Sequence, residues 1–237
     1  FAMKTRFPSL SEYAKIQSEE EDENLEPERL YNGNAGFELF FMNKLISLRG
    51  DYFINVVDDR IVKVAKDEPP QNVERTVSQG VETIFTAETG KLGVLCNLFT
   101  TASYTYLHAR NKDDSEDAAV NKGPYLEFTP VHFVTADLRL DFISHTMINI
   151  WATIAVNQRI YAMDHRPTDT DDPYSTDYFT TVRLHDTVSL NTKVSQRFAK
   201  DYEVYFMVKN ILDDYNADPF DPGPGRTFYL GVTGKWH

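Results

Sequence analysis

The sequence has little of several features that would have placed it in a common class. Its single cysteine, Cys96, allows no disulfide within the chain and gives no indication of the redox compartment. Basic residues number 24 against 36 acidic ones, for a net charge of −12, which argues against nucleic-acid binding because a phosphate backbone attracts basic surfaces. No apolar run approaches the roughly 20 residues of a membrane helix, and the mean hydropathy is −0.44. A membrane β-barrel is still allowed, because alternating lipid-facing and lumen-facing residues average to a modest hydropathy.

Motifs of covalent chemistry are also missing. The sequence contains no G-x-S-x-G nucleophile elbow, no P-loop and no dinucleotide-binding fingerprint. Its histidines are spread over separate segments without H-x-x-x-H spacing: His108, His132, His145, His165 and His185. The sequence therefore predicts no enzyme, no cofactor and no metal site.

Two acidic clusters allow a different interpretation. Carboxylates are the ligands that Ca²⁺ prefers, but neither cluster has the spacing of an EF-hand, and acidic loops are usually only solvated. The clusters are Asp113, Asp114, Glu116 and Asp117 in one segment and Asp169, Asp171 and Asp172 in another. We expect both to be exposed loops.

Alternation with a period of two is the strongest positive signal. In the last segment, apolar side chains alternate with polar ones: Phe228, Leu230, Val232 and Trp236 against Thr227, Tyr229, Thr233 and Lys235. Such a pattern predicts a strand with one apolar and one polar face. The segment 216–225 before it is rich in proline and glycine, and is predicted to be a loop because proline cannot donate to a sheet.

Similar segments recur along the chain. They are 2–7, 36–41, 48–56, 80–85, 92–106, 134–142, 148–156, 178–197, 202–209 and 227–236. About ten strands are thus predicted, most of them near the roughly 9–11 residues that a tilted strand needs to cross a bilayer. Asp137, Arg139 and Asp141 share one parity and are interpreted as a water-facing charge ladder. Asp186 breaks the apolar parity of 178–197, so we expect it to lie beyond the apolar band.

The connections between these segments alternate in length. Those at 43–44, 88–91, 144–146 and 199–201 are short, whereas those at 58–72, 108–129, 164–175 and 213–226 are long. A soluble sandwich has no reason to keep its short turns at one end, but a transmembrane barrel has short periplasmic turns and long extracellular loops. The sequence therefore predicts an all-β, antiparallel transmembrane β-barrel of up-and-down strands, with one parity facing hydrocarbon and the other bordering water.

The C-terminal region also resembles a known family. The run Val208-Lys209-Asn210-Ile211-Leu212-Asp213, then Tyr215, then Pro224-Gly225-Arg226-Thr227-Phe228-Tyr229-Leu230-Gly231-Val232 is similar to the closing signature of TonB-dependent outer-membrane receptors. In that family the pattern is V-x-N-L-[FL]-D-x-x-Y, then P-G-R-x-[FY]-x-[LV]-G and an aromatic strand. The family commonly ends on the aromatic residue itself, a place that Trp236 takes here, before His237.

Other segments resemble the same receptors. Phe7-Pro8-Ser9-Leu10-Ser11-Glu12 and Asn24-Leu25-Glu26-Pro27-Glu28 are similar to the family's F-P-x-L-x-E and N-x-x-L-x-P-E motifs, which flank an extracellular loop. The second motif is slightly contracted in this chain. Gly80-Val81-Glu82, the segment 102–107 and Pro130-Val131-His132 also resemble receptor segments.

The resemblance implies a location, a role and several partners. It implies that residues 1–237 form the C-terminal portion of a larger barrel, of about 22 strands, in the bacterial outer membrane, with the plug domain absent from this chain. The implied partners are the N-terminal plug and the remaining barrel strands, the TonB energy-transducing complex, outer-membrane lipid and a small-molecule ligand such as a ferric siderophore. Because an open sheet would leave bare edges in lipid, we expect a piece of a longer product or a chain that pairs with an N-terminal fragment. The first six residues lack the apolar segment of a signal peptide, which is consistent with that expectation.

Aromatic residues in or beside the long loops are the candidate ligand contacts: Tyr125, Phe128, Tyr161, Tyr174, Tyr215 and Phe220. The alternative is that aromatics only mark the girdle at the membrane surface. Two other functions stay open, a soluble acidic all-β binding protein and a passive porin-like channel. The F-R-A-P motif of haem receptors is absent, which makes a haem ligand less favoured.

Overall fold

The computed structural model describes residues 1–17, 25–63, 70–112, 125–126, 128–164, 178–198, 202–214 and 223–234. Within these residues the chain forms strands β1 to β12 and one short helix, α1 (Leu10–Gln17). Ten strands form one antiparallel sheet, so the predicted all-β fold is confirmed, whereas the helix was not predicted. No helix in the described part of the chain is long and apolar enough to span a bilayer.

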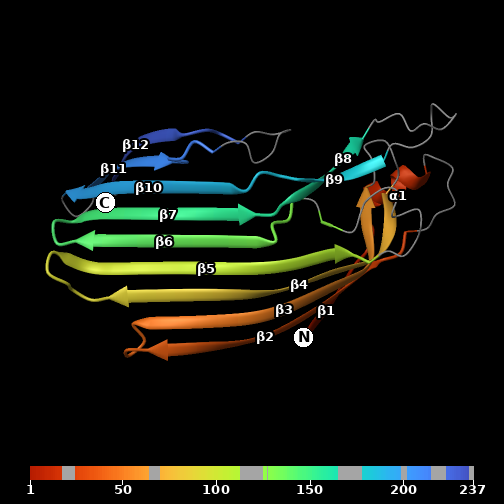
Figure 1. The fold of residues 1–237 in the computed structure, drawn as a ribbon, viewed down its shortest axis with the longest axis horizontal. Helices are drawn as coiled ribbons and strands as arrows, with labels where there is room; N and C mark the ends of the chain where they lie inside the picture. The colour runs from red at the N-terminus through yellow and green to blue at the C-terminus, as the bar shows by residue number, and fades with distance from the viewer. Residues whose placement is uncertain are drawn as a thin grey trace.

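The large sheet follows the chain order except for one insertion (Figure 1). In spatial order its strands are β1 (Ala2–Arg6), β2 (Glu28–Phe41), β3 (Ile46–Lys63), β4 (Pro70–Thr89), β5 (Leu95–Asn111), β6 (His132–Phe142), β7 (Thr146–Val156), β10 (Thr187–Phe198), β11 (Tyr202–Lys209) and β12 (Thr227–Gly234). The insertion is the hairpin of β8 (Arg159–Asp164) and β9 (Tyr178–Arg183), which projects beyond the ends of β7 and β10 (Figure 1).

The sheet is open. Strands β1 and β12 stand at its two ends, and within the described residues each pairs with one neighbour only. Unpaired N–H and C=O groups of an edge strand cost several kcal/mol each in hydrocarbon. The sheet is therefore an arc of a larger barrel and not a closed small one.

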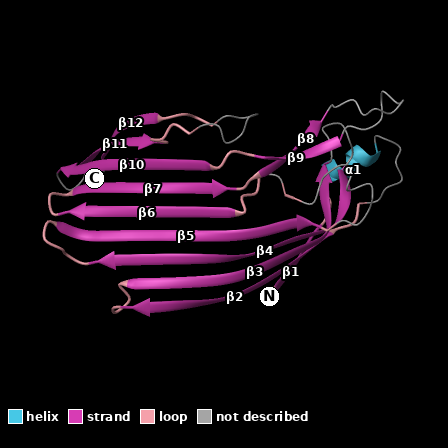
Figure 2. Cartoon of the chain, in the orientation of Figure 1, coloured by secondary structure: helices cyan, strands magenta, loops and turns pink. Residues whose placement is uncertain are grey.

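Short turns lie together at one end of the sheet, on the left in Figure 2. One joins β2 to β3 through Met42, Asn43 and Lys44, all with positive φ, and another joins β6 to β7 through His145. At the opposite end β3, β4 and β5 continue far beyond the roughly 9–11 residues of a membrane crossing, with 18, 20 and 17 residues. The predicted turns at 43–44 and 144–146 are confirmed, while the turn at 199–201 lies outside the described residues.

Several predicted boundaries were wrong; β5, for example, runs to Asn111, into the loop predicted at 108–129. The segment 58–72 is not all loop, because β3 runs to Lys63 and β4 starts at Pro70. Proline is tolerated as the first residue of a strand, where its missing N–H breaks no hydrogen bond of the sheet. The segment 178–197 is not one strand, because β9 pairs with β8 outside the large sheet and the chain returns to the large sheet only at β10. At that break the Asp186 carboxylate accepts hydrogen bonds from the Asn157 backbone N–H at 2.8 Å and from Arg183 at 2.7 Å. The hydrogen bond from the Asn157 backbone, and then the one from Arg183, lower the pKa of Asp186. Asp186 lies outside the large sheet, as expected.

Cross-strand register divides the side chains of the large sheet into two faces. One register row crosses seven strands with apolar residues only: Leu39, Leu48, Phe85, Ala102, Ala136, Ala152 and Leu190. The adjacent row on the opposite face is largely polar: Glu38, Arg49, Ile84, Ser103, Thr135, Thr153 and Ser189. Asp137, Arg139 and Asp141 lie on this polar face, as predicted.

The burial of side chains identifies which face is outward. Apart from Gly50, which the Phe37 ring covers, the described strand residues that are buried in the large sheet lie on the polar face: Thr76, Gly80, Ala155, Asn191 and Ser195. Large exposed apolar side chains gather on the other face, where Leu230 is 80% and Val232 68% exposed. The accessible area of 16157 Å² far exceeds the roughly 10,900 Å² of a compact monomer of this mass. The apolar face is therefore the outer face and the polar face the inner one, and the soluble alternative does not fit.

Candidate ligand-binding site

A tyrosine held between two arginines lies at the long-loop end of the sheet. Tyr125 forms an isolated bridge with Arg110, near the end of β5. The Arg110 guanidinium carbon is 4.7 Å from the centre of the Tyr125 ring, and that of Arg159, the first residue of β8, is 4.0 Å away. Cations over an aromatic face are attracted by its quadrupole. The sheet and the β8–β9 hairpin therefore bring two cations onto one ring.

The electrostatics of this cluster favour negative charge. Hydrogen bonding from Arg159, and then the charges of both guanidiniums, lower the pKa of the Tyr125 hydroxyl. Within the described residues no carboxylate lies within 4.0 Å of Arg110 or Arg159, whereas Arg75, Arg139 and Arg183 each have one. In a chain of net charge −12, two arginines with no carboxylate partner among the described residues form a local positive spot. Guanidiniums bind carboxylate and phosphate groups through paired donors.

Phe128 lies next to this spot in a strained conformation. Its φ is +55°, which is rare for a bulky side chain. Two hydrogen bonds hold it there: its N–H donates to the Arg159 carbonyl at 2.9 Å, and its carbonyl accepts from the Gln158 side chain at 3.1 Å. The side chain is 48% exposed. Strain of this kind persists only where surrounding contacts determine it, and it gathers at binding sites.

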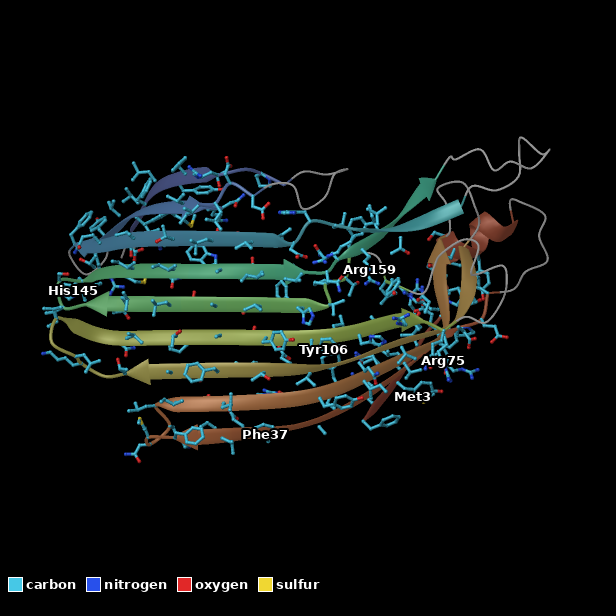
Figure 3. All side chains as sticks on the ribbon, in the orientation of Figure 1. Met3, Phe37, Arg75, Tyr106, His145 and Arg159 are labelled. Atoms are coloured by element: carbon cyan, nitrogen blue, oxygen red, sulfur yellow. The ribbon has the colours of Figure 1, made fainter. Side chains whose placement is uncertain are left out.

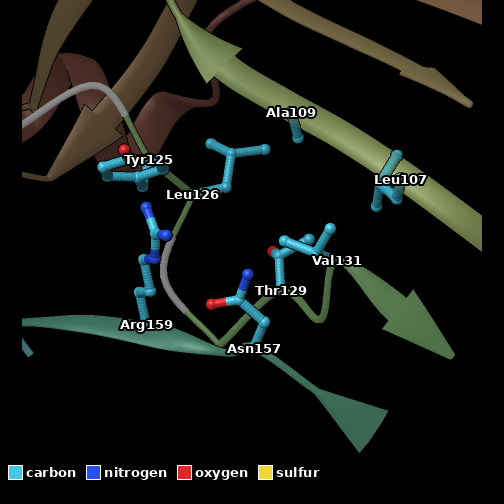
Figure 4. A pocket seen from close by; sticks show the side chains of 8 residues that line it. All are labelled: Leu107, Ala109, Tyr125, Leu126, Thr129, Val131, Asn157 and Arg159. Atoms are coloured by element: carbon cyan, nitrogen blue, oxygen red, sulfur yellow. The ribbon is translucent and has the colours of Figure 1, made fainter. Parts of the chain in front are cut away.

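A small hollow on the inner side of the cluster has a volume of about 20 Å³. Figure 4 shows Arg159 pointing toward Tyr125 and Leu126 lying beside them. The lining residues are Leu107, Ala109, Tyr125, Leu126, Thr129, Val131, Asn157 and Arg159. Such a volume holds about one water molecule. The hollow therefore fits one group of a larger ligand rather than a whole ligand.

The structure describes three of the six predicted contact residues. Tyr125 and Phe128 both lie against Arg159, while Tyr161 belongs to β8, two residues further on. Tyr174, Tyr215 and Phe220 lie outside the described residues, as do both acidic clusters. In the described part of the chain, no group of His, Cys, Asp or Glu side chains is arranged to hold a metal ion. Arg110 and Arg159 were missed, because no local pattern distinguishes them from other basic residues.

Other aromatics on the outer face form a girdle. Tyr104 and Tyr106 lie beside His132, with ring-centre distances of 6.1 and 5.5 Å, and the Tyr104 hydroxyl is 2.9 Å from His132 Nδ1. The Tyr52 hydroxyl donates to the Gln79 side chain at 3.1 Å. Amphipathic rings with one polar end are typical of the membrane–water boundary. These aromatics therefore suit the membrane–water boundary, whereas Tyr125 and Phe128 lie beside Arg159, beyond the end of β5.

The motif at 208–214 has a structural role, because its hydrogen bonds join neighbouring parts of the sheet. The Asn210 backbone N–H donates to the Asn191 side chain on β10 at 2.9 Å, and the Val188 N–H donates to the Asp214 carboxylate at 2.9 Å. Asp213 accepts from the Arg226 N–H at 2.6 Å. The asparagine and aspartates of the signature thus tie β10, the end of β11 and the approach to β12 together.

The motif at 7–12 is a capping box that the sequence analysis did not use. The Ser9 N–H donates to the Glu12 carboxylate at 2.6 Å, and the Glu12 N–H approaches the Ser9 hydroxyl at 3.4 Å, which starts α1. Arg6 bridges Glu12 at 2.7 Å and Glu28 at 3.0 Å. The backbone hydrogen bond from Ser9, followed by Arg6, lowers the pKa of Glu12 to about 2. This box fixes the path from β1 to β2 on the long-loop side.

Comparison with known proteins agrees with this architecture. The family model for the TonB dependent receptor-like β-barrel matches residues 2–211. The chain therefore belongs to the TonB-dependent receptor β-barrel family, and it lies in the bacterial outer membrane. The resemblance drawn from the C-terminal signature is confirmed. No curated protein matches the chain.

Solved structures show the same fold at low identity. The outer membrane transporter YddB from Escherichia coli has a TM-score of 0.68 at 13% identity, over 90% of this chain and 33% of that one. The FrpB iron transporter from Neisseria meningitidis has 0.66 at 16%, over 90% and 32%. The siderophore receptor PirA from Acinetobacter baumannii has 0.65 at 15%, over 89% and 32%. The chain thus spans about a third of the length of these structures.

Proposed function

We propose that residues 1–237 form the C-terminal portion of the barrel of an outer-membrane active-transport receptor that imports a scarce solute, such as a ferric siderophore or another metal chelate, with energy supplied through TonB. The observation that carries the proposal is an outward apolar, inward polar sheet whose long-loop end holds Arg110, Tyr125 and Arg159 together. The neighbours FrpB and PirA, an iron transporter and a siderophore receptor by name, support this substrate class. The role is transport, with no covalent step.

The ligand contact is proposed at Tyr125 and Phe128. A metal chelate with carboxylate, phenolate or phosphate groups carries negative charge at its periphery, which suits two arginines that have no carboxylate partner in the part of the chain that the structure describes. Phe128 adds an exposed ring held in place by Arg159 and Gln158. The cluster lies outside the membrane-crossing part of β5, so a ligand arriving from the medium meets it first.

The inner face is proposed to receive the plug domain. Several of its charges are paired within the sheet, as in Arg49–Asp51 at 2.5 Å and Lys193–Glu203 at 3.0 Å. A partner that packs on such a face does not have to neutralise buried charge, which would be costly. This arrangement suits a plug that rearranges during transport. The remaining strands of the barrel would pair with β1 and β12.

The experiment uses the complete receptor produced in outer membranes. Binding and uptake of radiolabelled catecholate, hydroxamate and carboxylate iron chelates are measured in cells with and without TonB. For a recognised chelate, we expect Arg159→Gln to weaken binding by roughly tenfold or more, because a charged hydrogen bond is lost. Arg183→Gln is the matched control, since that arginine is exposed on β9 and already has Asp186 as its partner.

Two outcomes would overturn the proposal. Uptake that persists without TonB, together with ion conductance in planar bilayers, would favour the passive porin-like channel. Equal loss of chelate binding in Arg159→Gln and Arg183→Gln would remove the Tyr125 cluster from the site. TonB-dependent uptake with a selective effect of Arg159→Gln would support both parts of the proposal.

A further inference from the structure

The inner wall of β2 and β3 carries a group of amide side chains. One register row on the inner face crosses β1 to β5 with small or uncharged polar residues only: Ala2, Asn32, Asn55, Ser78 and Ala109. The next inward row toward the short turns crosses β2 to β5: Asn34, Phe53, Gly80 and Leu107. Neither row contains a charged residue. We call Asn32, Asn34 and Asn55 the amide cluster.

This wall continues from the small hollow of the candidate site. Leu107 and Ala109, which end the two rows on β5, also line that hollow. In Figure 3, Tyr106 and Arg159 both lie well away from the short turn that carries His145. Tyr106 directly precedes Leu107 on β5, so the two rows belong to the long-loop half of the sheet. The amide cluster and the candidate site therefore share one stretch of the inner wall.

The amide cluster keeps hydrogen-bonding capacity for a ligand. Asn32 Nδ2 donates to Asn55 Oδ1, which leaves the Asn32 oxygen and the Asn55 amide nitrogen without a partner among the described residues. Asn34 is exposed, and its side chain makes no hydrogen bond within the described part of the chain. Between these amides and the hollow, the Phe53 ring lies over Gly80 so closely that a Cβ there would overlap it. The ring thus gives the wall a flat apolar surface beside the amides.

The chemistry of this wall differs from that of the arginine pair. An asparagine side chain has two N–H donors and an acceptor oxygen, so it binds groups that both donate and accept hydrogen bonds. A charged group against an uncharged wall would lose hydration without gaining an ionic partner. The wall therefore suits an uncharged polar group such as another amide, whereas Arg110 and Arg159 suit an anionic group.

We propose that the amide cluster is a second part of the ligand site and binds amide groups in an uncharged arm of the imported chelate. The ligand is then elongated, with its anionic metal-binding end at Arg110 and Arg159 and its arm lying across the Phe53 ring to the amide cluster. Neighbouring strands are about 4.8 Å apart, so the arm spans about 14 Å from β5 to β2. The inference rests on the proposed function, since it extends the ligand site at Tyr125.

The test uses pairs of synthetic, radiolabelled ferric chelates with catecholate, hydroxamate or carboxylate groups. The two members of a pair share their iron-binding groups, but one has amide bonds in its arms and the other has methylene groups in their place. Each chelate is titrated against the complete receptor in outer membranes, and correct folding is checked by heat-modifiable migration in gels.

Two variants remove the amide cluster in parts. Asn34→Ala removes an exposed side chain without a hydrogen-bond partner in the described part of the chain. Asn32→Val with Asn55→Val removes both partners of one hydrogen bond, a change that is nearly neutral for stability. Asn97→Ala is the matched control, because Asn97 is an inward asparagine at the short-turn end of β5 and donates to Glu88 at 2.9 Å.

We expect the parent and the control to bind the amide member of at least one pair roughly tenfold more tightly than its methylene analogue, because several neutral hydrogen bonds are lost in the analogue. Asn34→Ala is expected to bind the amide member about fivefold more weakly and the methylene member as the parent does. The Asn32→Val, Asn55→Val variant is expected to do the same, and Asn34→Gln, which keeps an amide, to retain most of the preference.

Three results would overturn the inference. They are equal affinity of the parent for both members of every pair, an equal loss for both members in Asn34→Ala, and binding of no chelate at all. Arg159→Gln in the same titrations tests the proposed function separately. Weaker binding of both members in that variant would support the site at Tyr125 even where the amide preference is absent, whereas unchanged binding would reject that site.

Discussion

The side chain of Asn210 binds the backbone of Asp214 at both of its polar groups. Its Nδ2 donates to the Asp214 carbonyl at 2.9 Å, and its Oδ1 accepts from the Asp214 N–H at 3.1 Å. A third bond reaches the Pro224 carbonyl at 3.3 Å. Asn210 is buried and has a φ of +52°, which asparagine adopts more readily than most residues. The asparagine of the family's signature motif thus holds the connection of the last hairpin together through side-chain hydrogen bonds.

We predict that Asn210→Ala lowers the free energy of unfolding of the complete receptor by about 3 kcal/mol, because buried backbone groups lose their partners and alanine resists positive φ. Asn210→Gly is expected to cost about 1 kcal/mol less, since glycine accepts this φ. Asn43→Ala is the control, because Asn43 has a φ of +55° in an exposed turn. Urea titration of the folded receptor measures all three. Equal effects for Asn210→Ala and Asn43→Ala would show that the hydrogen bonds contribute nothing.

A second prediction concerns the closing strand pair. The Tyr205 ring on β11 covers Gly231 on β12 so closely that a Cβ there would overlap it, an arrangement in which an aromatic ring shields a glycine in a sheet. We predict that Gly231→Ala lowers the free energy of unfolding by about 1–3 kcal/mol. Gly90→Ala is the control with open space around the new carbon. Combining Gly231→Ala with Tyr205→Leu is expected to cost less than the sum of the two, and strict additivity would argue against the contact.

The assignment of faces predicts opposite results at two positions of β7. Ile150 points outward, opposite Leu138, whereas Thr153 points inward, opposite Thr135. We predict that Ile150→Lys lowers the free energy of unfolding of the receptor in lipid vesicles by about 2–4 kcal/mol, the cost of a lysine at the bilayer midplane. Thr153→Lys is expected to change it by less than about 1 kcal/mol, because the inner face is in contact with water. The reverse order of the two variants would exchange the inner and outer faces.

The capping box gives a pH-dependent prediction. The pKa of Glu12 is lowered from 4.5 in the unfolded chain to about 2, so its contribution to stability is complete above about pH 4.5 and is lost as the pH falls toward 2. We expect hydrogen-exchange protection of the Glu12 and Tyr13 amides, which bond to the Ser9 carbonyl at 3.0 and 3.1 Å, to fall over that range. Glu12→Gln keeps the capping geometry and is expected to abolish this pH dependence. A variant with an unchanged pH profile would assign the effect to other carboxylates.

Local patterns were sufficient for the membrane strands. Segments 134–142 and 148–156 were predicted from alternation alone, and β6 and β7 extend them by only two residues at one end each. The boundaries failed where side-chain contacts override the pattern. Helix α1 depends on the bonds between Ser9 and Glu12, and the break before β10 depends on Asp186 meeting Asn157, which is distant in sequence.

The candidate site was found only in part. Tyr125 and Phe128 were identified as aromatics beside a long loop; both lie near Arg159, and their contact with a ligand stays a prediction. Arg110 and Arg159 were not identified, because they come from different strands and have no motif in common.

The alternation along each strand belongs to the sequence alone. Because successive side chains in a strand point to opposite faces, the order of residues decides which of them meet lipid and which meet water, before any strand is paired. Which strands become neighbours, and at what offset, is a property of the assembled sheet. Arg29, Asp58 and Arg75 lie side by side only because hydrogen bonds between strands set the register, and a register is shared by two segments. Arg110 and Arg159 enclose Tyr125 because backbone contacts join Tyr125 to Arg110 and Phe128 to Arg159.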